Sequence, residues 1–267
     1  MELGIMADGP QEGFDLTICE IKMSSGRVLE PVPGVYNAVN CLADNRAERL
    51  HAEDLALSKE GRATRRNLRR DSAWVCPTHP QYKEGLLELV EKAAAVGEGI
   101  VLESLGFPGE GYCTCERCQA KWKASGLGWE DWKCSVVTEF VAAARERIGG
   151  KELGLSLHPD PITPRAYGYD LRALSEYTDF FIAPLYARSY STAYWVGLLA
   201  KAYRLLLKKP CYTALYARVP EEELYKAAMT AAPYSDGIIF FGDVDKARRV
   251  AGRISPATSP GAHRPSP

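Results

Sequence analysis

Four cysteines have the spacing of a metal site. Cys113, Cys115 and Cys118 place three thiols within six consecutive residues, and Cys76 lies upstream. Four thiolates satisfy tetrahedral zinc and leave no coordination position open, so a site of this kind is structural rather than catalytic. The sequence therefore predicts a structural zinc ion held by these four side chains.

Other assignments of the cysteines stay open. His79 or Cys134 could replace Cys76 as the fourth ligand, and the cluster could instead consist of free or disulfide-bonded thiols. The N-terminus lacks the basic start and the apolar run of a signal peptide, so we expect a reducing compartment and a cytoplasmic protein. In such a compartment, clustered cysteines are more often metal ligands than disulfide partners.

A carboxylate ends one buried apolar run. Glu103 follows the apolar residues 99–102, and residues 104–108 have the composition of a loop. In α/β barrels the carboxyl ends of the strands carry the active site. Burial there raises the pKa of a carboxyl group, which suits a general acid. Glu103 is the predicted acid/base catalyst, and a structural carboxylate paired with an arginine is the alternative.

Glycoside cleavage requires a second carboxylate. Asp243 follows the apolar run 238–241, and Asp160 follows the run 153–157, so these two are the leading candidates. Glu20, inside the run 17–21, is a third candidate. Asp245 is expected to cap a helix instead.

A second group of side chains at strand ends could bind a sugar. A Tyr-x-Arg pattern occurs twice, as Tyr186 with Arg188 and as Tyr216 with Arg218, and His158 ends another strand. Aromatic rings stack on sugar faces, while arginines bind hydroxyl or carboxylate groups. The pattern favours a carbohydrate or uronate-type ligand. Aromatic packing around the barrel mouth is the alternative, and His158 could be an ordinary hydrogen-bonding residue.

These side chains need a parallel sheet to bring them together. Short apolar runs alternate with segments of helical periodicity, which is typical of strand–helix units in a parallel sheet. The predicted strands are 99–103, 153–157, 179–183, 211–215 and 237–241, and the predicted helices are 79–96, 132–148, 170–177, 193–207 and 221–232.

The first half of the chain is less regular. Residues 14–21 and 35–40 are predicted strands, and residues 4–6 are either an edge strand or the end of a helix. We predict a single α/β domain of the (β/α)8 TIM-barrel type over residues 1–254, possibly incomplete or irregular at its N-terminus. A zinc-bearing insertion is expected near 104–122, and a disordered tail over 255–267.

Composition sets limits on the partners. The chain has 267 residues and a formal net charge of −1, which gives no global electrostatic case for nucleic acid or a membrane. No Gly-rich phosphate loop or Gly-x-Ser-x-Gly motif is present. A local basic run could be a solvated segment or an anion-binding patch; it consists of Arg62, Arg65, Arg66, Arg69 and Arg70.

The central segment resembles a known family. The motifs are Cys76-Pro77, His79-Pro80, Tyr82, the strand ending in Glu103, the run Tyr112-Cys113-x-Cys115-x-x-Cys118 and Trp122. This pattern resembles the zinc-bearing β-galactosidases of glycoside hydrolase family forty-two and related glycosidase-like TIM barrels. The resemblance implies that Cys76, Cys113, Cys115 and Cys118 bind zinc. It also implies that Glu103, at the end of the fourth strand, is the acid/base catalyst.

The sequence departs from that family at two points. Leu102 precedes Glu103 where the family has an asparagine, and residues 211–218 contain no carboxylate where the family has its nucleophile. The leading hypothesis is a glycoside hydrolase-like enzyme acting on a carbohydrate. The rival is a non-catalytic carbohydrate-binding barrel, and a third hypothesis is a hydrolase whose basic run binds an anionic substrate. The sequence makes no prediction of the sugar, the linkage or the oligomeric state.

Overall fold

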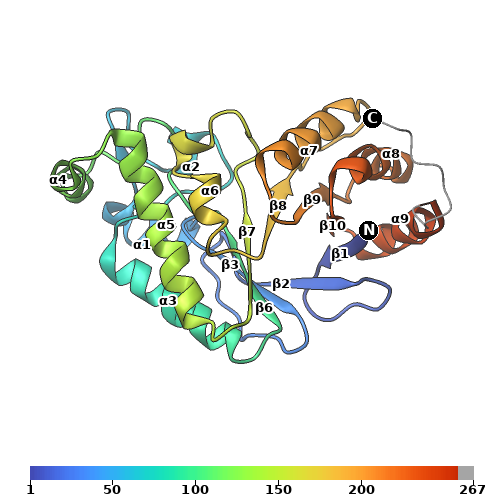
Figure 1. The fold of residues 1–267 in the computed structure, drawn as a ribbon. Helices are drawn as coiled ribbons and strands as arrows, with labels where there is room; N and C mark the ends of the chain where they lie inside the picture. Colours follow the sequence, from blue (N-terminus) through green and yellow to red (C-terminus); the bar gives the residue numbers. More distant parts are fainter. Residues whose placement is uncertain (258–267) are drawn as a thin grey trace.

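The computed structural model describes residues 1–257, which form a closed barrel of parallel strands (Figure 1). Neighbouring strands follow the order β1-β10-β9-β8-β7-β6-β3-β2. Most of these strands are short apolar runs that are buried on both faces, as a barrel covered by helices requires. The strands are β1 Glu2–Met6, β2 Leu16–Lys22, β3 Tyr36–Asn40, β6 Gly99–Glu103, β7 Glu152–Ser156, β8 Phe180–Pro184, β9 Cys211–Tyr216 and β10 Gly237–Phe241.

The predicted TIM barrel is confirmed, and the expectation that it could be incomplete is wrong. Residues 4–6 belong to β1, which pairs in parallel with both β10 and β2 and so closes the barrel. The N-terminal part is irregular because no helix joins β1 to β2 or β2 to β3. The strands β1 and β2 are adjacent, and the connection 7–15 is long enough to return along one strand in extended form.

The five predicted helices correspond to α3, α5, α6, α7 and α8, whereas no range was predicted for α4 or α9; the helices cover the barrel from two sides. In Figure 1, α3 and α5 lie on one side and α7, α8 and α9 on the other. None of the helices within residues 1–257 is long and apolar enough to cross a membrane. The bounds are α3 Pro80–Ala94, α4 Glu116–Ser125, α5 Trp129–Arg147, α6 Leu171–Leu174, α7 Tyr194–Leu206, α8 Glu221–Ala231 and α9 Val244–Ala257.

The last helix extends beyond the predicted domain boundary. Helix α9 continues to Ala257, so residues 255–257, which were predicted to begin a disordered tail, are helical. The rest of that predicted tail, 258–267, lies outside the described residues.

The interior of the barrel changes character along its axis. Successive side chains of a strand point to opposite faces, so every second residue points inward. The inward layer in the middle of the barrel is apolar and includes Ile18 on β2, Ala38 on β3 and Val101 on β6. Two residues further along these strands, the same alternation turns Glu20, Asn40 and Glu103 inward. The carboxyl end of the barrel therefore closes on polar groups instead of apolar ones.

Two long segments rise above this end of the barrel. The segment 41–79 follows β3 and folds back on itself through isolated bridges between Ala43 and Trp74 and between Leu55 and Val75. The segment 104–115 follows β6. Together they build one wall above the strand ends. The elements in the first segment are α1 Asn45–Leu50, η1 Ala52–Asp54, the hairpin of β4 Leu57–Ser58 with β5 Gly61–Arg62, and α2 Arg65–Leu68.

Candidate functional site

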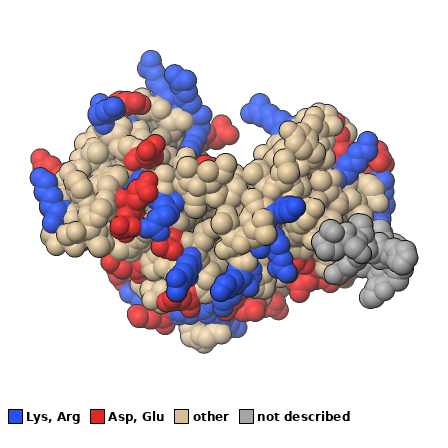
Figure 2. Space-filling model, turned by 45° about the horizontal axis from the view of Figure 1, so that its top comes forward, with Lys and Arg blue, Asp and Glu red and all other residues tan. Residues whose placement is uncertain are grey.

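A cleft of about 700 Å³ opens over the carboxyl ends of the strands. Figure 2 shows the molecule hollowed between two lobes, with Lys and Arg side chains on both rims. The floor of the cleft includes Glu20, Asn40, Glu103 and Ser156, which come from four consecutive strands of the barrel, β2, β3, β6 and β7. A cleft of this size at this end of a barrel is where TIM-barrel active sites lie.

Glu103 has the protonation behaviour of a general acid. Burial, together with the negative charge of Glu20, raises the pKa of the Glu103 carboxyl to about 8. Its side chain is partly exposed and lines the cleft. At neutral pH this group therefore carries a proton and can donate it to a ligand in the cleft.

Glu20 is the carboxyl group that faces Glu103 across β3. Burial raises the pKa of Glu20, while the Asn40 amide and the Lys22 ammonium act in the opposite direction. No group within residues 1–257 lowers the pKa of Glu103 in this way. The two carboxyl groups therefore have different surroundings, and Glu20 is the one that ionises more readily. Two carboxyl groups whose pKa values differ in this way can divide the roles of acid and base.

Asp243 and Asp160 lie elsewhere, and neither lines the cleft. Asp243 accepts a hydrogen bond of 3.0 Å from the Lys246 backbone N–H and pairs with its ammonium at 3.7 Å, so it holds the start of α9. Asp160 accepts hydrogen bonds from the Ile162 N–H at 2.8 Å and from the Thr163 hydroxyl at 2.6 Å. These bonds lower the pKa of both carboxyl groups. The geometry favours Glu20 over both as the partner of Glu103.

The expected helix cap is also a different residue. Asp243 accepts the N–H bond at the start of α9, whereas Asp245 lies within the helix and pairs with Arg248 at 3.1 Å. The chain turns sharply before Asp243 because Gly242 adopts a φ of +112°, a conformation that favours glycine. This turn points Asp243 toward the helix instead of the cleft.

His158 lies in the cleft as a neutral ring. Burial, followed by the positive charge of Arg70, lowers the pKa of the imidazole to about 4. The ring stacks on Tyr167 with 3.7 Å between centroids, and its Nδ1 accepts a bond of 3.3 Å from the Asp160 N–H. Because Nδ1 accepts, Nε2 carries the proton of the neutral ring and can donate a hydrogen bond to a ligand.

An aromatic row forms the opposite wall. Tyr186 and Phe241 line the cleft, with their ring centroids 5.5 Å apart, and Tyr216 packs on the far side of Phe241 at 5.8 Å. Phe241 is 37% exposed and Tyr186 43%, so both present ring faces to a ligand. The predicted residues Tyr216, Arg188 and Arg218 do not line the cleft. The doubled Tyr-x-Arg pattern thus supplies one wall residue, Tyr186, and a supporting ring, Tyr216.

The lining residues that were not predicted as site residues include Trp74 and Asn40, and also Arg70, which was named only as part of the basic run. Trp74 donates from its indole N–H to the Gly106 carbonyl at 2.8 Å and so joins the two wall segments. Arg70 is the last residue of the basic run and the only arginine of that run that lines the cleft. Arg65 pairs with Glu48 at 2.6 Å and serves the structure of the wall. The only feature of the sequence that could have placed Asn40 in the cleft is the alternation of inward and outward residues along the strand that ends just before Cys41.

The four predicted cysteines converge beside this wall. Their Sγ atoms all lie within 4.8 Å of one another, and Cys76 approaches Cys118 at 3.5 Å and both Cys113 and Cys115 at 3.7 Å. Zinc–sulfur bonds of about 2.3 Å in a tetrahedron place the sulfurs about 3.8 Å apart. The cluster therefore has the dimensions of a four-thiolate metal site, and it could hold a metal such as zinc.

The two alternative ligands lie outside the cluster. His79 caps α3 by accepting from the Tyr82 N–H at 3.2 Å, and its Nε2 pairs with Asp54 at 3.0 Å. Cys134 is buried against the Arg165 carbonyl at 4.0 Å. The prediction of Cys76 as the fourth member is thus favoured by the geometry.

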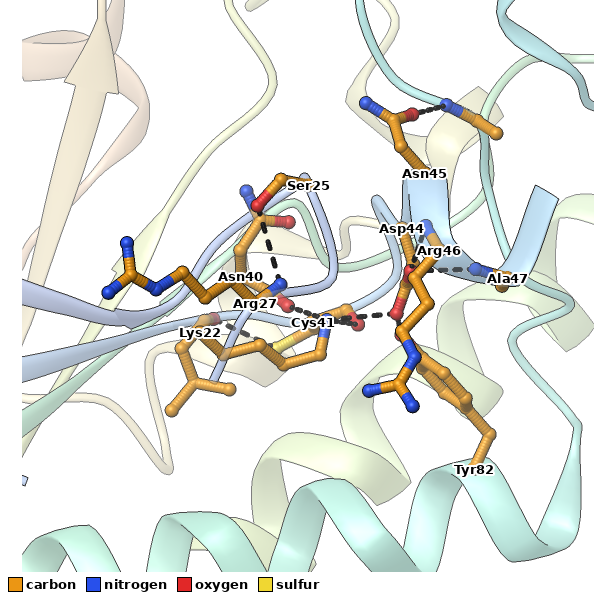
Figure 3. Close-up of polar contacts among 12 residues, drawn as sticks. Lys22, Ser25, Arg27, Asn40, Cys41, Asp44, Asn45, Arg46, Ala47 and Tyr82 are labelled. Atoms are coloured by element: carbon orange, nitrogen blue, oxygen red, sulfur yellow. Dashed lines mark hydrogen bonds and ion pairs between the residues drawn. The ribbon is translucent and has the colours of Figure 1, made fainter. Parts of the chain in front are cut away.

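A buried polar network braces the floor from behind. The Lys22 ammonium donates to the Asn40 carbonyl at 2.8 Å and pairs with Asp44 at 3.5 Å. The Tyr82 hydroxyl of α3 donates to the same carboxylate at 2.7 Å. Figure 3 shows Lys22 and Tyr82 directed toward Asp44 from opposite sides. Asp44 also accepts from the Ala47 N–H at 2.9 Å and so caps α1. This network fixes the backbone at the end of β3.

Known structures share the fold. The glycoside hydrolase domain of PgaB (BpsB) from Bordetella bronchiseptica matches with a TM-score of 0.63 and 15% identity, over 87% of this chain and 76% of that chain. The β-amylase catalytic domain from Paenibacillus polymyxa matches with a TM-score of 0.51 and 10% identity, over 93% of this chain and 97% of that chain. The β-mannanase of the blue mussel Mytilus edulis matches with a TM-score of 0.51 and 12% identity, over 98% of this chain and 94% of that chain.

These likenesses establish a glycoside hydrolase-like TIM barrel fold. They do not single out family forty-two, to which the cysteine motif bears a resemblance. No family model and no curated protein matches the chain.

Proposed function

We propose that this protein is a glycoside hydrolase whose catalytic pair is Glu103 and Glu20. The observation that carries the proposal is the presence of two inward carboxyl groups, in unlike electrostatic surroundings, on the floor of one cleft. A wall of exposed aromatic faces opposite Trp74 suits the flat apolar faces of sugar rings. The shared fold with several glycoside hydrolases supports the same conclusion by analogy.

The roles follow from the protonation states. Glu103 donates its proton to the glycosidic oxygen as the bond from that oxygen to the anomeric carbon breaks, and the leaving sugar departs as an alcohol. Glu20, ionised, acts on the other side of the anomeric carbon. It either takes a proton from the attacking water or bonds to the carbon and is later released by water. In both courses one glycosidic bond and one water molecule are consumed, and both carboxyl groups return to their initial states.

The same proposal assigns the metal site a supporting role. We infer that the four thiolates bind zinc, which has no open position for substrate and supplies no step of the reaction. Cys76 belongs to the segment after β3, whereas Cys113, Cys115 and Cys118 follow β6. A metal ion would therefore tie together the two wall segments that carry Arg70, Trp74 and Phe107.

A carbohydrate-binding barrel without activity is the rival function. The observation that favours it is β9, whose sequence Cys-Tyr-Thr-Ala-Leu-Tyr contains no carboxylate where family forty-two has its nucleophile. Under the proposed function, Glu20 of β2 fills that chemical role. Hydrolysis that is lost in both Glu103→Gln and Glu20→Gln, with sugar binding retained, supports the enzyme. Binding without turnover by the wild type supports the rival.

The pH dependence of activity should be bell-shaped. Glu103 must be protonated, so kcat/KM on a neutral substrate should fall as pH rises through about 8, the pKa of Glu103. Glu20 must be ionised, and because burial raises its pKa, the acid limb should lie above the ordinary range of a glutamate. The measurement is kcat/KM from pH 4 to 10 in buffers of constant ionic strength. An alkaline limb that survives in Glu103→Gln would assign it to another group.

Arg70 favours a substrate that carries an acidic group. Arg70 lines the cleft, and its side chain forms no ion pair with any residue in 1–257. Its positive charge contributes to the lowered pKa of His158. We expect Arg70→Ala to weaken the binding of an oligogalacturonate about three- to tenfold at low salt. Arg66→Ala is the matched control, because Arg66 is exposed on the same segment and does not line the cleft. Isothermal titration at two salt concentrations provides the measurement. Equal, salt-independent binding of a neutral oligosaccharide of the same length would argue against an acidic substrate.

A further inference from the structure

The side chain of Asn40 lies between the two carboxyl groups. Asn40 ends β3, and β3 is the strand that separates β2, with Glu20, from β6, with Glu103. In the β3–β6 ladder, Asn40 and Glu103 are direct partners, so both side chains point to the same face of the sheet. On the other side, the Asn40 Nδ2 is 3.5 Å from the Glu20 Oε1, a long hydrogen bond. Strand order and register thus place the Asn40 side chain between the two carboxyl groups.

The amide oxygen of Asn40 lacks a partner. Asn40 is only 7% exposed, and its Oδ1 is buried without a hydrogen bond from any residue in 1–257. A buried polar atom of this kind costs free energy unless something donates to it. Because Asn40 lines the cleft floor, the donor can be a protonated group of that floor, a water molecule or a ligand. A carboxylate accepts only, so Glu103 can serve as the donor only in its protonated form.

The backbone of Asn40 is fixed, so the side chain has little freedom to avoid this position. Its carbonyl accepts from the buried Lys22 ammonium at 2.8 Å, and Lys22 is itself held by Asp44 and Tyr82 (Figure 3). An ordered network of this kind pre-organises the groups it holds.

We propose that Asn40 is the positioning residue that assigns the roles of the pair: its Nδ2 donates to Glu20, and its Oδ1 accepts the carboxyl proton of Glu103. This arrangement stabilises one of the two ways of sharing a single proton, with Glu103 as the acid and Glu20 as the base. Turning the amide by half a rotation would reverse the assignment. Asn40 itself does not react, and acts through the two carboxyl groups.

Among the other charged and titratable groups around the pair, Lys22 of β2 also favours the ionised form of Glu20, in the same direction as the Asn40 amide. The Cys41 thiol experiences the charge of Glu103, and the Tyr186 phenol experiences the charges of both Glu103 and Glu20. The pKa of both Cys41 and Tyr186 is raised, so these groups are neutral near pH 7. Burial accounts for most of the raised pKa of Glu103, and the Asn40 acceptor adds a specific partner for its proton.

The test is a titration that needs no substrate. The holoprotein is labelled with ¹³C at the glutamate side-chain carboxyls, and the two resonances are assigned with Glu20→Gln and Glu103→Gln. We expect Asn40→Ala to lower the Glu103 midpoint by about one pH unit, the scale of one lost hydrogen bond, and to raise that of Glu20 by less. Asn40→Asp keeps an acceptor beside Glu103, so the Glu103 midpoint should stay raised while the Glu20 midpoint rises. If Asn40→Ala does not fold, Asn40→Leu, which keeps the approximate shape of the side chain without either polar atom, should shift both midpoints in the same directions as Asn40→Ala.

Ser156→Ala is the matched control. Ser156 is buried, lines the same floor, and lies on β7, the other neighbour of β6. The variant removes a hydroxyl from the same floor and should leave both midpoints unmoved. Unchanged midpoints in both Asn40 variants, or an equal shift in Ser156→Ala, would overturn the proposal. Loss of oligosaccharide binding in Asn40→Ala with unchanged midpoints would also overturn it, because Oδ1 would then serve a ligand hydroxyl.

The catalytic meaning of this inference rests on the proposed function, but its test does not. Shifted midpoints without hydrolysis of any glycoside would remove the proposed function and leave the role of Asn40 in place. Hydrolysis with unshifted midpoints would do the reverse.

Discussion

Glu103→Gln should lower kcat about 10²- to 10⁴-fold on a glycoside with an alkyl leaving group, which is the usual contribution of a general acid. The loss should be much smaller on a nitrophenyl glycoside, because nitrophenolate departs without protonation. Glu20→Gln should reduce both rates alike. Asp243→Asn and Asp160→Asn are the matched controls, since these carboxylates lie outside the cleft and should leave both rates near those of the wild type. An equal loss on both leaving groups in Glu103→Gln would count against its role as the acid.

The same variant should be more stable than the wild type at alkaline pH. The pKa of Glu103 is about 8 in the folded chain, above its ordinary 4.5, so the folded state binds this proton more tightly than the unfolded state. Stability that depends on that proton is full below about 4.5 and is lost as pH rises toward 8. Glutamine does not ionise and avoids this loss. The melting temperature of Glu103→Gln should therefore exceed that of the wild type by a few degrees at pH 8 and by little at pH 4.5.

Removal of the metal should have the largest effect on stability. The four thiols come from segments far apart in the sequence, and a metal ion that joins them offsets the entropy of ordering both wall segments. We expect purified protein to contain about one zinc per chain, and Cys118→Ser or chelation to lower the melting temperature by roughly 10 °C or more. Metal content by mass spectrometry and melting curves by calorimetry provide the two measurements.

Cys134→Ser is the matched control for this experiment. Cys134 is buried like Cys118 but lies against the Arg165 carbonyl, outside the cluster. Its substitution should leave the metal content unchanged and cost much less stability. A metal-free protein with the same melting curve before and after chelation would contradict the structural role.

Much of the barrel could be predicted because its strands carry strong local signals. The run Gly-Ile-Val-Leu-Glu of β6 is apolar on both faces, and a carboxylate at its end has few structural reasons to be there. Helix α3 has an apolar stripe and a capping residue, His79. The close spacing of Cys113, Cys115 and Cys118 was enough to predict a metal site. The choice of Cys76 over His79 or Cys134 needed the fold.

Glu20 could not be preferred from the sequence, because its position only acquires meaning in the closed barrel. In β2 it lies between Cys19 and Ile21, both fully buried and facing outward into the helix layer. Only the strand order β2-β3-β6 brings it near Glu103. For Asp243 the sequence was misleading in the other direction. Asp243 follows a strand directly, but the turn at Gly242 directs it to α9 and away from the cleft.

The cleft wall was the least predictable part. Arg70 and Trp74 belong to a segment of short elements without a sustained helical or strand period, so local patterns gave no position for them. Their place is set by long-range contacts, such as the bond from the Trp74 indole to the Gly106 carbonyl. Such contacts become visible only when the two wall segments meet.

The most direct test of the central claim is the hydrolysis of a panel of neutral and acidic nitrophenyl glycosides by the wild type and by the double variant Glu20→Gln, Glu103→Gln. The account predicts that the wild type releases nitrophenol from at least one glycoside, and that the double variant, still folded and still able to bind oligosaccharide, loses this activity about 10³-fold or more. Activity that persists in the folded double variant would show that the chemistry lies elsewhere. Tight oligosaccharide binding by a wild type that hydrolyses none of the panel would contradict the enzyme and establish the binding barrel.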